Sequence, residues 1–344
     1  MRVLTQERTE QKQTKAASLP LTLHGVAGLL KACGDPLRLD ILRVLKNDTF
    51  GVSELAQIFD MPQPGMTHHL KLLAKSQVLA TRRQGNSIFY RRPLTVGDSP
   101  GEGLLQQLFS TIDELEVSPE LRRKIELVHI ERSKRSRDFF EKHFQDVSDN
   151  QAQLCDQSHY VANLGELLDA TGVDKQSSAL EVGPGTGLFL EELARRFDKV
   201  VALDQSKKML GLAKENLAKT STGILFLEES LESFQPENPF DVIALNMVLH
   251  HMPSPPKTFE LLASMIAKGG YLIIADLCTH DQQWTKETCG DLWQGFDPSD
   301  LDAWAKNAGF IEKQSLYLGL KNGFQIQLKL FTTLSSHPSF ERRK

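Results

Sequence analysis

The second half of this chain is constrained by a repeated alternation of short apolar runs with amphipathic helical stretches. Such alternation is typical of βαβ units, whose strands pair in parallel and are buried on both faces. It therefore predicts an α/β domain built on a parallel sheet. The runs, all rich in Val, Ile and Leu, are Ser178–Val182, Lys199–Leu203, Gly223–Leu227, Phe240–Leu245 and Gly270–Ala275.

The last part of the chain has a different pattern. A helix is expected over Pro298–Ala308. Two further apolar runs, Phe310–Leu318 and Gln325–Thr333, flank a short segment that contains Asn322-Gly323. Two strands joined by a short Asn-Gly turn predict an antiparallel hairpin. Together with the five parallel strands, the hairpin gives a sheet of seven strands.

The first hundred residues show helical spacing followed by two short strands. Asp35 and Pro36 are residue types favoured at a helix start. A short helix, a turn, a longer helix and a two-stranded wing form the order of a winged helix-turn-helix, an α+β arrangement. The predicted elements are helices over Leu23–Ala32, from Pro36 onward, over Ser53–Phe59 and over Pro64–Ala74, a turn over Met61–Gly65, and strands over Val78–Thr81 and Ser87–Arg91.

The net charge of −4 hides two oppositely charged regions. Residues 1–100 hold 14 Lys and Arg against 8 Asp and Glu, whereas residues 101–344 hold 26 against 36. A basic front joined to an acidic body indicates that one end of the chain meets a polyanion and the other does not.

A DNA-binding surface is expected on the predicted recognition helix and the wing. Leu70, Leu72 and Leu73 are assigned to the apolar side of that helix, so its polar residues face outward. Outward donors suit base edges and phosphates, while arginines beside a wing suit phosphates or the minor groove. An outward polar residue can also simply be solvated. The candidates are Gln63, Thr67, His68, Lys71, Arg82, Arg83 and Arg91, with Arg92 beside them.

Three motifs in this region carry a family resemblance. Cys33–Leu42, Ser53–Ala56 and His68–Leu73 resemble the ArsR/SmtB family of bacterial repressors. The resemblance covers about residues 23–92 and implies a homodimer that binds an inverted repeat in double-stranded operator DNA. Many members sense metals through cysteines, but the stretch Thr49–Ala56 has none and Gly103–Leu115 has no His, so no metal site is expected.

The remaining N-terminal segments complete a four-part organisation. Residues 1–20 are polar and are expected to be a disordered tail. The domain predictions are a winged helix at 21–95, a helical linker or dimerisation region at 96–150, and the α/β domain at 151–335. Helices are expected over Gly103–Leu115 and from Ser118 to about Phe144, the second as a solvated connector, a dimer-forming helix or a DNA-flanking helix.

A glycine-rich turn joins the first predicted parallel strand to its helix. Gly183, Gly185 and Gly187 allow a ligand to approach the backbone at a helix N-terminus. The dinucleotide fingerprint requires Gly where Leu188 stands, and the Gly-Lys-Ser/Thr of a phosphate-binding loop is absent. The GxGxG spacing, with Glu181 two residues before it, fits S-adenosylmethionine, whose ammonium group Glu181 is expected to hold through water.

Polar residues follow the next three strands. Asp204 ends the second strand, where a carboxylate can accept both ribose hydroxyls. Glu229 follows the third strand, where an acid accepts from the adenine amino group, and Glu228 is the alternative. Asn246 ends the fourth strand, beside the expected position of the methyl group. Ligands in open α/β sheets bind at these strand ends.

The second half resembles the class I, seven-stranded, S-adenosylmethionine-dependent methyltransferases with a Rossmann-like fold. Phe240–His251 is most similar to the small-molecule branch. The Asn/Asp-Pro-Pro-Tyr/Phe signature of adenine or glutamine methylation is missing, since Asn246–Leu249 stands there. Arsenite methylation requires converging thiolates, and Cys155, Cys278 and Cys289 lack a clustered pattern.

Candidate catalytic residues lie after the fourth and fifth strands. His250, His251 and Asp276 can act as base or as orienting group. The histidine pair can equally be structural, and methyl transfer can proceed by alignment of the nucleophile alone. The segment Trp284–Trp293 is either a lid over the acceptor site or a surface loop anchored by its tryptophans.

Three functional hypotheses follow. The chain is a transcriptional regulator whose methyltransferase-like body senses S-adenosylmethionine or S-adenosylhomocysteine, or methylates an effector. Alternatively, it is a small-molecule methyltransferase with an autoregulatory DNA-binding domain, or its winged helix is only a protein-interaction module. The absence of a signal peptide, of a long apolar span and of paired cysteines, with Cys33 expected in the core, indicates the cytoplasm.

Overall fold

The computed structural model describes residues 22–94, 100–146, 154–155, 158–217 and 223–333. The predicted tail therefore lies outside the described residues. The chain divides into two compact units, residues 1–83 with 87–125, and residues 84–86 with 126–344. The predicted helical region at 96–150 falls partly into each unit. None of the helices in the described ranges is long and apolar enough to cross a lipid bilayer.

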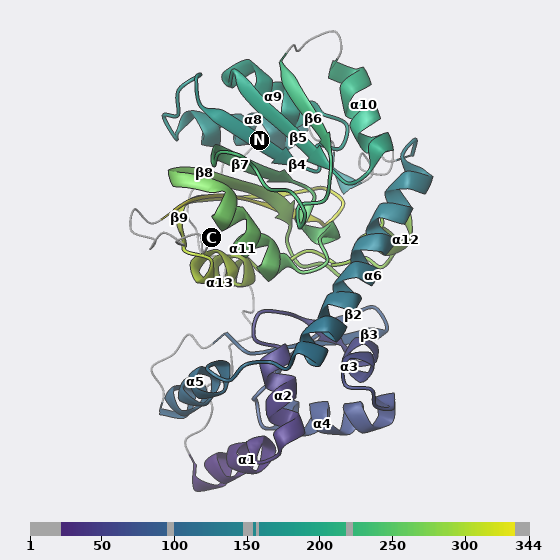
Figure 1. Ribbon diagram of the computed structural model, residues 1–344, viewed down its shortest axis with the longest axis vertical. Helices are drawn as coiled ribbons and strands as arrows, with labels where there is room; N and C mark the ends of the chain where they lie inside the picture. Colours follow the sequence, from purple (N-terminus) through teal and green to yellow (C-terminus); the bar gives the residue numbers. More distant parts are fainter. Residues whose placement is uncertain (1–21, 95–99, 147–153, 156–157, 218–222, 334–344) are drawn as a thin grey trace. The chain divides into compact units, whose positions relative to one another are not determined.

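The N-terminal unit combines helices with a small sheet (Figure 1). Its three-stranded sheet has the order β1-β3-β2, and β1 runs antiparallel to β3. The first elements are α1 Leu23–Cys33, α2 Pro36–Val44, β1 Phe50–Gly51, α3 Val52–Ile58, α4 Gln63–Lys75, β2 Ala80–Gln84 and β3 Ser87–Arg91. The predicted helix-turn-helix order and the two wing strands are confirmed. The two-residue strand β1 was not predicted, because so short a strand leaves no alternating pattern.

Local signals explain where these helices begin. The side chain of Asp35 accepts a hydrogen bond from the backbone N–H of Arg38 at 3.0 Å, and Pro36 opens α2 as predicted. The predicted turn over Met61–Gly65 is wrong in its second half. Helix α4 already begins at Gln63, because a proline in the first helical turn lacks only an N–H that has no partner within the helix.

The buried side of α4 differs from the prediction at one position. Met66, Leu70 and Leu73 are buried, at the spacing of one helix face, whereas Leu72 is exposed. The assignment of Leu72 to the apolar side is therefore wrong, since it lies off the stripe defined by the other three residues.

Two helices follow the wing. They are α5 Pro100–Asp113 and α6 Pro119–His143. The hydroxyl of Ser118 accepts from the backbone N–H of Leu121 at 3.2 Å, which confirms the predicted helix start. Helix α6 is not solvated on all sides, because Val128, His129, Arg132 and Ser136 are buried at the spacing of one face. Its residues up to Ile125 belong to the N-terminal unit, and those from Glu126 belong to the C-terminal unit.

The C-terminal unit contains a seven-stranded sheet in the order β6-β5-β4-β7-β8-β10-β9. Strands β4 to β8 pair in parallel, and β10 is antiparallel to both β8 and β9. This confirms the predicted five parallel strands and terminal hairpin. The strands are β4 Ser178–Val182, β5 Lys199–Asp204, β6 Ile224–Glu228, β7 Phe240–Asn246, β8 Ile266–Leu277, β9 Phe310–Gly319 and β10 Gln325–Thr333.

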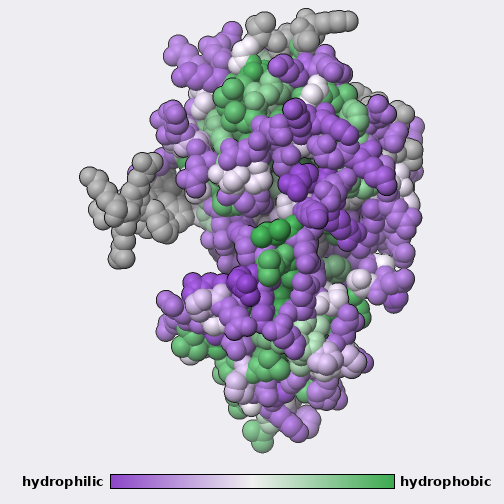
Figure 2. Space-filling view, turned by 45° about the vertical axis from the view of Figure 1, so that its right-hand side comes forward, coloured by the Kyte–Doolittle hydropathy of each residue, from purple (hydrophilic) through white to green (hydrophobic). Residues whose placement is uncertain are grey.

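Helices pack beside this sheet (Figure 1). The core contains apolar residues from the sheet together with α8 and α9, among them Leu164, Phe189 and Ile273. Figure 2 shows that the side of the molecule turned to the viewer is mainly hydrophilic, with apolar side chains gathered in patches. The helices of this unit, in addition to most of α6, are α8 Ser158–Asp169, α9 Leu188–Arg196, α10 Lys207–Leu217, the 3-10 helix η1 Leu249–His251, α11 Pro255–Met265, α12 Trp284–Thr288 and α13 Pro298–Asn307.

Candidate functional site

A cavity of about 780 Å³, partly open to solvent, lies at the carboxyl ends of the parallel strands of the C-terminal unit. Helix α6 contributes Ser133, Ser136 and Phe140 to its wall. Most of the residues predicted to bind a cofactor meet here. Those that line the cavity are Gly183, Gly185, Asp204, Glu229 and Asn246, while Glu181 and Gly187 lie outside its lining. We call it the cofactor cavity.

The glycine-rich turn after β4 has a backbone that only glycine adopts without strain. Gly183 has φ +66°, and a Cβ added there would lie 2.4 Å from Cγ2 of Val248. Gly187 is the N-cap of α9 with φ 88°, and a Cβ there would lie 3.1 Å from Cδ1 of Leu217. The turn therefore needs glycine both for its conformation and for its close approach to η1 and α10.

Glu181 is a buried carboxylate without a partner in the described part of the chain. It is fully buried at the end of β4, and neither of its carboxylate oxygens accepts a hydrogen bond there. Burial raises its pKa well above the ordinary value. The side-chain oxygen of Asn246, at the end of β7, is also buried and unpartnered. These acceptors fit a cationic group such as the ammonium of S-adenosylmethionine.

The ends of β5 and β6 place the two other acids. One oxygen of Asp204 accepts from the backbone N–H of Ser206 at 2.8 Å, and burial raises the pKa of Asp204 to about 7. Glu229 lines the cavity and donates its backbone N–H to the carbonyl of Asp204 at 3.1 Å. Glu228 pairs in register with Asp204 and is exposed. The geometry therefore favours Glu229 over Glu228 as the acid beside a ligand.

His250 lies between two buried aspartates. Its Nδ1 is 2.9 Å from Oδ1 of Asp276, and its Nε2 is 3.6 Å from Oδ1 of Asp291. Its backbone N–H also donates to Asp276, at 3.2 Å. Burial alone lowers the pKa of His250, but the two carboxylates raise it to about 9. His250 is therefore a buried imidazolium with both N–H groups directed at carboxylates, and it does not line the cavity.

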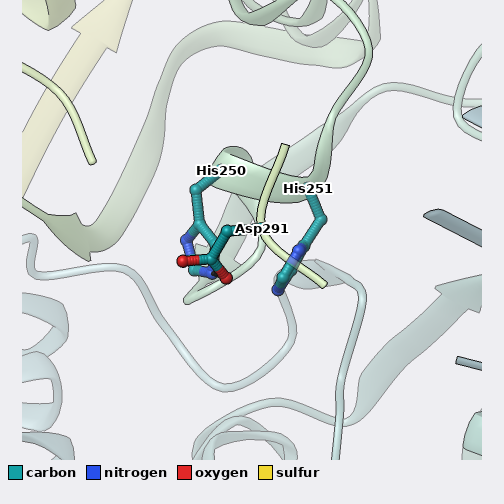
Figure 3. A group of neighbouring side chains, drawn as sticks. All are labelled: His250, His251 and Asp291. Atoms are coloured by element: carbon teal, nitrogen blue, oxygen red, sulfur yellow. Dashed lines mark ion pairs between the residues drawn. The ribbon is translucent and has the colours of Figure 1, made fainter. Parts of the chain in front are cut away.

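His251, the next residue, has the opposite character. Figure 3 shows the carboxylate of Asp291 beside the ring of His250, whereas the ring of His251 extends to the other side. His251 lines the cofactor cavity, and its Nδ1 is 3.3 Å from the carbonyl oxygen of Gly290. Burial and the neighbouring His250 cation lower its pKa well below the ordinary value. A neutral His251 that donates through Nδ1 has Nε2 available as an acceptor.

The segment after α12 is held against η1. The backbone N–H groups of Leu292 and Trp293 both donate to the carbonyl of His250 at 3.1 Å. The indole N–H of Trp293 donates to the carbonyl of Met252 at 2.8 Å, and the guanidinium of Arg132 stacks over the indole ring at 4.8 Å. These contacts favour the interpretation of this segment as an anchored loop rather than a lid. Sequence reasoning missed Asp291, because nothing local links it to His250.

His250, His251 and Asp291 also form a group whose possible ligand atoms lie within 4.8 Å of one another. The positive charge of His250 in this group faces the negative charges of Asp291 and of the neighbouring Asp276.

The four cysteines, Cys33, Cys155, Cys278 and Cys289, are all buried and unbridged. The expected placement of Cys33 in the core is confirmed.

The predicted DNA-binding residues of α4 extend from its first residue, Gln63, to Lys71. Gln63, His68 and Lys71 are exposed, and Thr67 is half-buried. The hydroxyl of Thr67 donates to the carbonyl of Gln63 at 2.7 Å. Gln63, Thr67 and Lys71 are spaced by one helical turn and therefore share one face. In the wing, Arg83 is exposed, and Arg82 and Arg91 are half-buried.

The expectation that Arg92 contacts DNA beside the wing is wrong. It is buried and makes a bidentate ion pair with Asp113, at 3.0 and 2.7 Å. Its Nε donates to the carbonyl of Leu42 at 2.7 Å, and its guanidinium lies 4.4 Å from the ring centre of Phe109. Arg92 follows β3 directly, and the two neighbouring helices enclose it.

Family comparisons agree with this architecture. A family model described as a methyltransferase domain matches residues 122–311, more than half of the chain, and one described as a helix-turn-helix domain matches residues 34–82. The chain therefore belongs to the methyltransferase family, whose members depend on S-adenosylmethionine. The acceptors at the ends of β4, β5 and β6 fit that cofactor.

Individual relatives are distant. The ubiquinone biosynthesis O-methyltransferase of Serratia proteamaculans (strain 568) is 24% identical over 170 residues, 45% of this chain and 70% of that protein. The same enzyme of Yersinia pestis (strain Pestoides F) is 22% identical over the same shares. The N-methyltransferase NodS from Bradyrhizobium japonicum WM9, solved with S-adenosyl-L-homocysteine, covers 58% of this chain and 98% of its own, with 18% identity and a TM-score of 0.47. Magnesium protoporphyrin IX methyltransferase from Synechocystis PCC 6803 covers 59% and 100%, with 16% identity and a TM-score of 0.47.

Proposed function

We propose that this protein is a DNA-binding regulator whose C-terminal domain transfers a methyl group from S-adenosylmethionine to a hydroxyl group of a small molecule. The observation that carries the enzymatic half is His251, a buried neutral histidine that lines the same cavity as the cofactor residues. The relatives named as O-methyltransferases support a hydroxyl acceptor. The site residues named below are part of this proposal.

The cofactor is held by residues at four neighbouring strand ends. Glu181 holds the ammonium group through water, and the turn of Gly183, Gly185 and Gly187 allows close approach of the methionine part. Asp204 accepts from the ribose hydroxyls, Glu229 from the adenine amino group, and Asn246 borders the methyl group. When bound, S-adenosylmethionine supplies an electrophilic methyl group on a sulfonium centre. The buried surroundings of Glu181 strengthen its interaction with a cation.

The proposed base is His251. Its Nδ1 is oriented by the carbonyl of Gly290, so Nε2 can accept the proton of an acceptor hydroxyl in the cavity. His250 and Asp276 serve as positioning residues, because the Asp276–His250 pair fixes η1, on which His251 stands. The lowered pKa of His251 keeps its ring unprotonated at neutral pH, so that Nε2 carries a free lone pair.

The test of the enzymatic half is methyl transfer by purified protein to hydroxylated small molecules or a cell extract. The variant His251→Asn is expected to reduce the turnover number by roughly a hundredfold to ten-thousandfold, the usual contribution of a general base. Its dissociation constant for S-adenosylhomocysteine is expected to stay within a few-fold of the parent value. A parent protein that binds the cofactor but methylates no acceptor would contradict the enzymatic proposal and leave cofactor sensing.

The N-terminal half is proposed to bind double-stranded operator DNA as a homodimer, in the manner implied by its resemblance to ArsR-type repressors. The proposed units are the winged helix at 21–95, the helical region at 96–150 and the methyltransferase domain at 151–335, in a cytoplasmic protein. The helix-turn-helix match at residues 34–82 supports DNA binding. The proposed contacts are Gln63, Thr67, His68, Lys71, Arg82, Arg83 and Arg91.

The wing provides the test of DNA binding. Replacing Arg82 and Arg83 together with Ala removes two cations per subunit, and therefore four in the proposed homodimer, that can neutralise phosphates. We expect weaker binding to a duplex containing the protein's own promoter, with the slope of log affinity against log salt reduced by about four. An electrophoretic mobility assay across a salt series measures this. Arg195, an exposed arginine of α9, is the matched control position for Ala substitution. Equal binding by all three proteins would eliminate the wing contacts.

A sensing role is the second candidate, and helix α6 favours it. Three of its residues line the cofactor cavity, while its first turns belong to the N-terminal unit, where Lys124 pairs with Asp60. A ligand in the cavity therefore touches a helix that continues into the DNA-binding unit. Titrating S-adenosylmethionine or S-adenosylhomocysteine into the promoter-binding assay tests coupling between the two sites. An operator affinity that no cofactor form changes would refute sensing.

A further inference from the structure

A second cavity lies between α6 and the beginning of α11. It has a volume of about 720 Å³ counting the part open to solvent, and all of its lining residues belong to the C-terminal unit. It shares four wall residues with the cofactor cavity: Ser133, Ser230, Glu232 and Pro253. His251 and Asn246, beside the proposed reacting atoms, do not line it. The second cavity therefore adjoins the cofactor cavity but does not include these two residues.

Basic side chains outnumber acidic ones in its lining. Lys134 and Arg137 come from α6, Lys257 comes from α11, and the acids are Glu126 and Glu232. Lys257 pairs with Glu126, with Nζ and Oε2 3.0 Å apart. The side chains of Lys134 and Arg137, both exposed residues, by contrast form no ion pair or hydrogen bond with another side chain in the described part of the chain. The charge available for a ligand is therefore mainly the two cations of α6.

The buried hydroxyl of Ser254 is a second, independent observation, because it lacks a hydrogen-bond partner. Ser254 is the N-cap of α11 and lines the cavity, yet its side chain makes no capping hydrogen bond. Only 2% of the residue is exposed, and its hydroxyl has no hydrogen-bond partner in the described ranges. A buried polar group without a partner costs free energy, which an acceptor oxygen from a ligand would recover.

We propose that this second cavity binds a small molecule that carries a phosphate group, held by Lys134, Arg137 and Ser254. A phosphate dianion can accept from an ammonium, a guanidinium and a hydroxyl at once, which a single carboxylate does less completely. Because Ser230 and Glu232 form walls of both cavities, the occupant changes the affinity for the cofactor. The ligand acts as an effector rather than as the methyl acceptor, since the residues at the reacting end lie outside this cavity.

Inorganic phosphate is the first probe, added to the full-length protein at constant ionic strength. We expect phosphate to raise the melting temperature in a saturable manner that potassium chloride does not reproduce. The double variant Lys134→Gln/Arg137→Gln is expected to raise the apparent dissociation constant for phosphate at least tenfold. Arg135→Gln, a matched charge removal at an exposed position of α6 outside the cavity, is expected to leave it unchanged. Succinate, as a carboxylate probe, is expected to bind more weakly than phosphate.

Ser254→Ala provides a test that does not alter charge. It is expected to raise the dissociation constant for phosphate at least threefold without lowering the melting temperature in the absence of phosphate. Binding of S-adenosylhomocysteine by each variant reports whether the domain is still folded. The proposal is overturned if phosphate acts no differently from chloride. It is also overturned if Ser254→Ala and the double variant respond to phosphate as the parent and Arg135→Gln do.

Discussion

Two groups of acidic residues at the strand ends around the cofactor cavity differ in whether a cation of the protein lies beside them. At the end of β4, Glu181 is a fully buried carboxylate without a partner among the described residues, and at the end of β5, Asp204 is half-buried and accepts from Ser206; desolvation raises the pKa of both. Beyond β7, the carboxylates of Asp276 and Asp291 lie beside a buried cation, His250. The first side is therefore incomplete without a ligand. On the second side a cation of the protein itself, His250, faces the carboxylates, and in this sense we call that side balanced, although burial also raises the pKa of Asp291, to about 6. Ligand binding and structural stability are thus assigned to different strand ends.

The largest effect on stability is expected when a partner of His250 is removed from the balanced side. Asp276→Asn leaves His250 with a weaker partner in a fully buried environment and removes an acceptor of its backbone N–H. Breaking a buried charge pair costs about 3–5 kcal/mol of unfolding free energy. Urea denaturation measures this loss. Glu116→Gln, which changes a carboxylate whose side chain is 92% exposed and lies 3.9 Å from Arg122, is the control and is expected to cost far less. A loss below about 1 kcal/mol for Asp276→Asn would contradict the balanced-charge interpretation.

The same pair predicts a pH dependence. The pKa of His250 is raised to about 9 from an ordinary value of 6.5. Its contribution is therefore fully present below pH 6.5 and is lost as the pH rises through about 9, an effect on the order of 3 kcal/mol. Unfolding free energies measured across this range test the prediction. In His250→Gln this part of the pH dependence is expected to disappear. An unchanged profile would assign it to another group.

Glu181→Gln tests whether the carboxylate on the incomplete side serves cofactor binding rather than stability. Removing the charge is expected to raise the dissociation constant for S-adenosylmethionine by about tenfold to a hundredfold, the range for a charge-assisted hydrogen bond. The cofactor-free protein should become more stable at neutral pH, because a buried ionisable group whose pKa is raised opposes folding as the pH rises above its ordinary value. Calorimetry measures both. Lower affinity together with lower stability would instead indicate a structural role.

The smallest expected effect concerns the backbone of the glycine-rich turn. Gly183→Ala combines a positive φ with a contact of 2.4 Å to Val248, whereas Gly172→Ala has φ +68° and nothing within 4 Å. The control variant therefore measures backbone strain alone, about 1–2 kcal/mol. Gly183→Ala should cost more than this and weaken cofactor binding. If the two variants lose equal stability in denaturant titrations, the close approach of η1 to the turn has no energetic importance.

Local patterns in the sequence predicted the fold and the incomplete side well. Each parallel strand is a short apolar run, and Asp204 and Asn246 directly end their strands, so one sheet edge brings them together. Asp35 and Pro36 similarly marked the start of α2. In these cases the signal and the structure involve the same few residues.

Contacts between segments that are distant in the chain could not be predicted from local sequence patterns. His250 and His251 are adjacent in the chain, and only the packing of Asp291 and Gly290 gives them opposite protonation. The charge pattern of α6 indicated a connector but could not reveal that Ser133 and Ser136 face a cavity. Arg91 and Arg92 also look equivalent, yet Asp113 and the helices around it bury only the second.

The strand order has a consequence for the newly made chain. Strand β10 pairs with β8 on one side and β9 on the other, and it is the last of the seven strands to be synthesised. Until residue 333 has left the ribosome, β8, 12 residues long and mostly buried in the finished sheet, is an unpaired edge. Unpaired apolar edges pair with other chains. Chains that stop before β10 should therefore aggregate, which makes translation through the final hairpin the step that protects this protein.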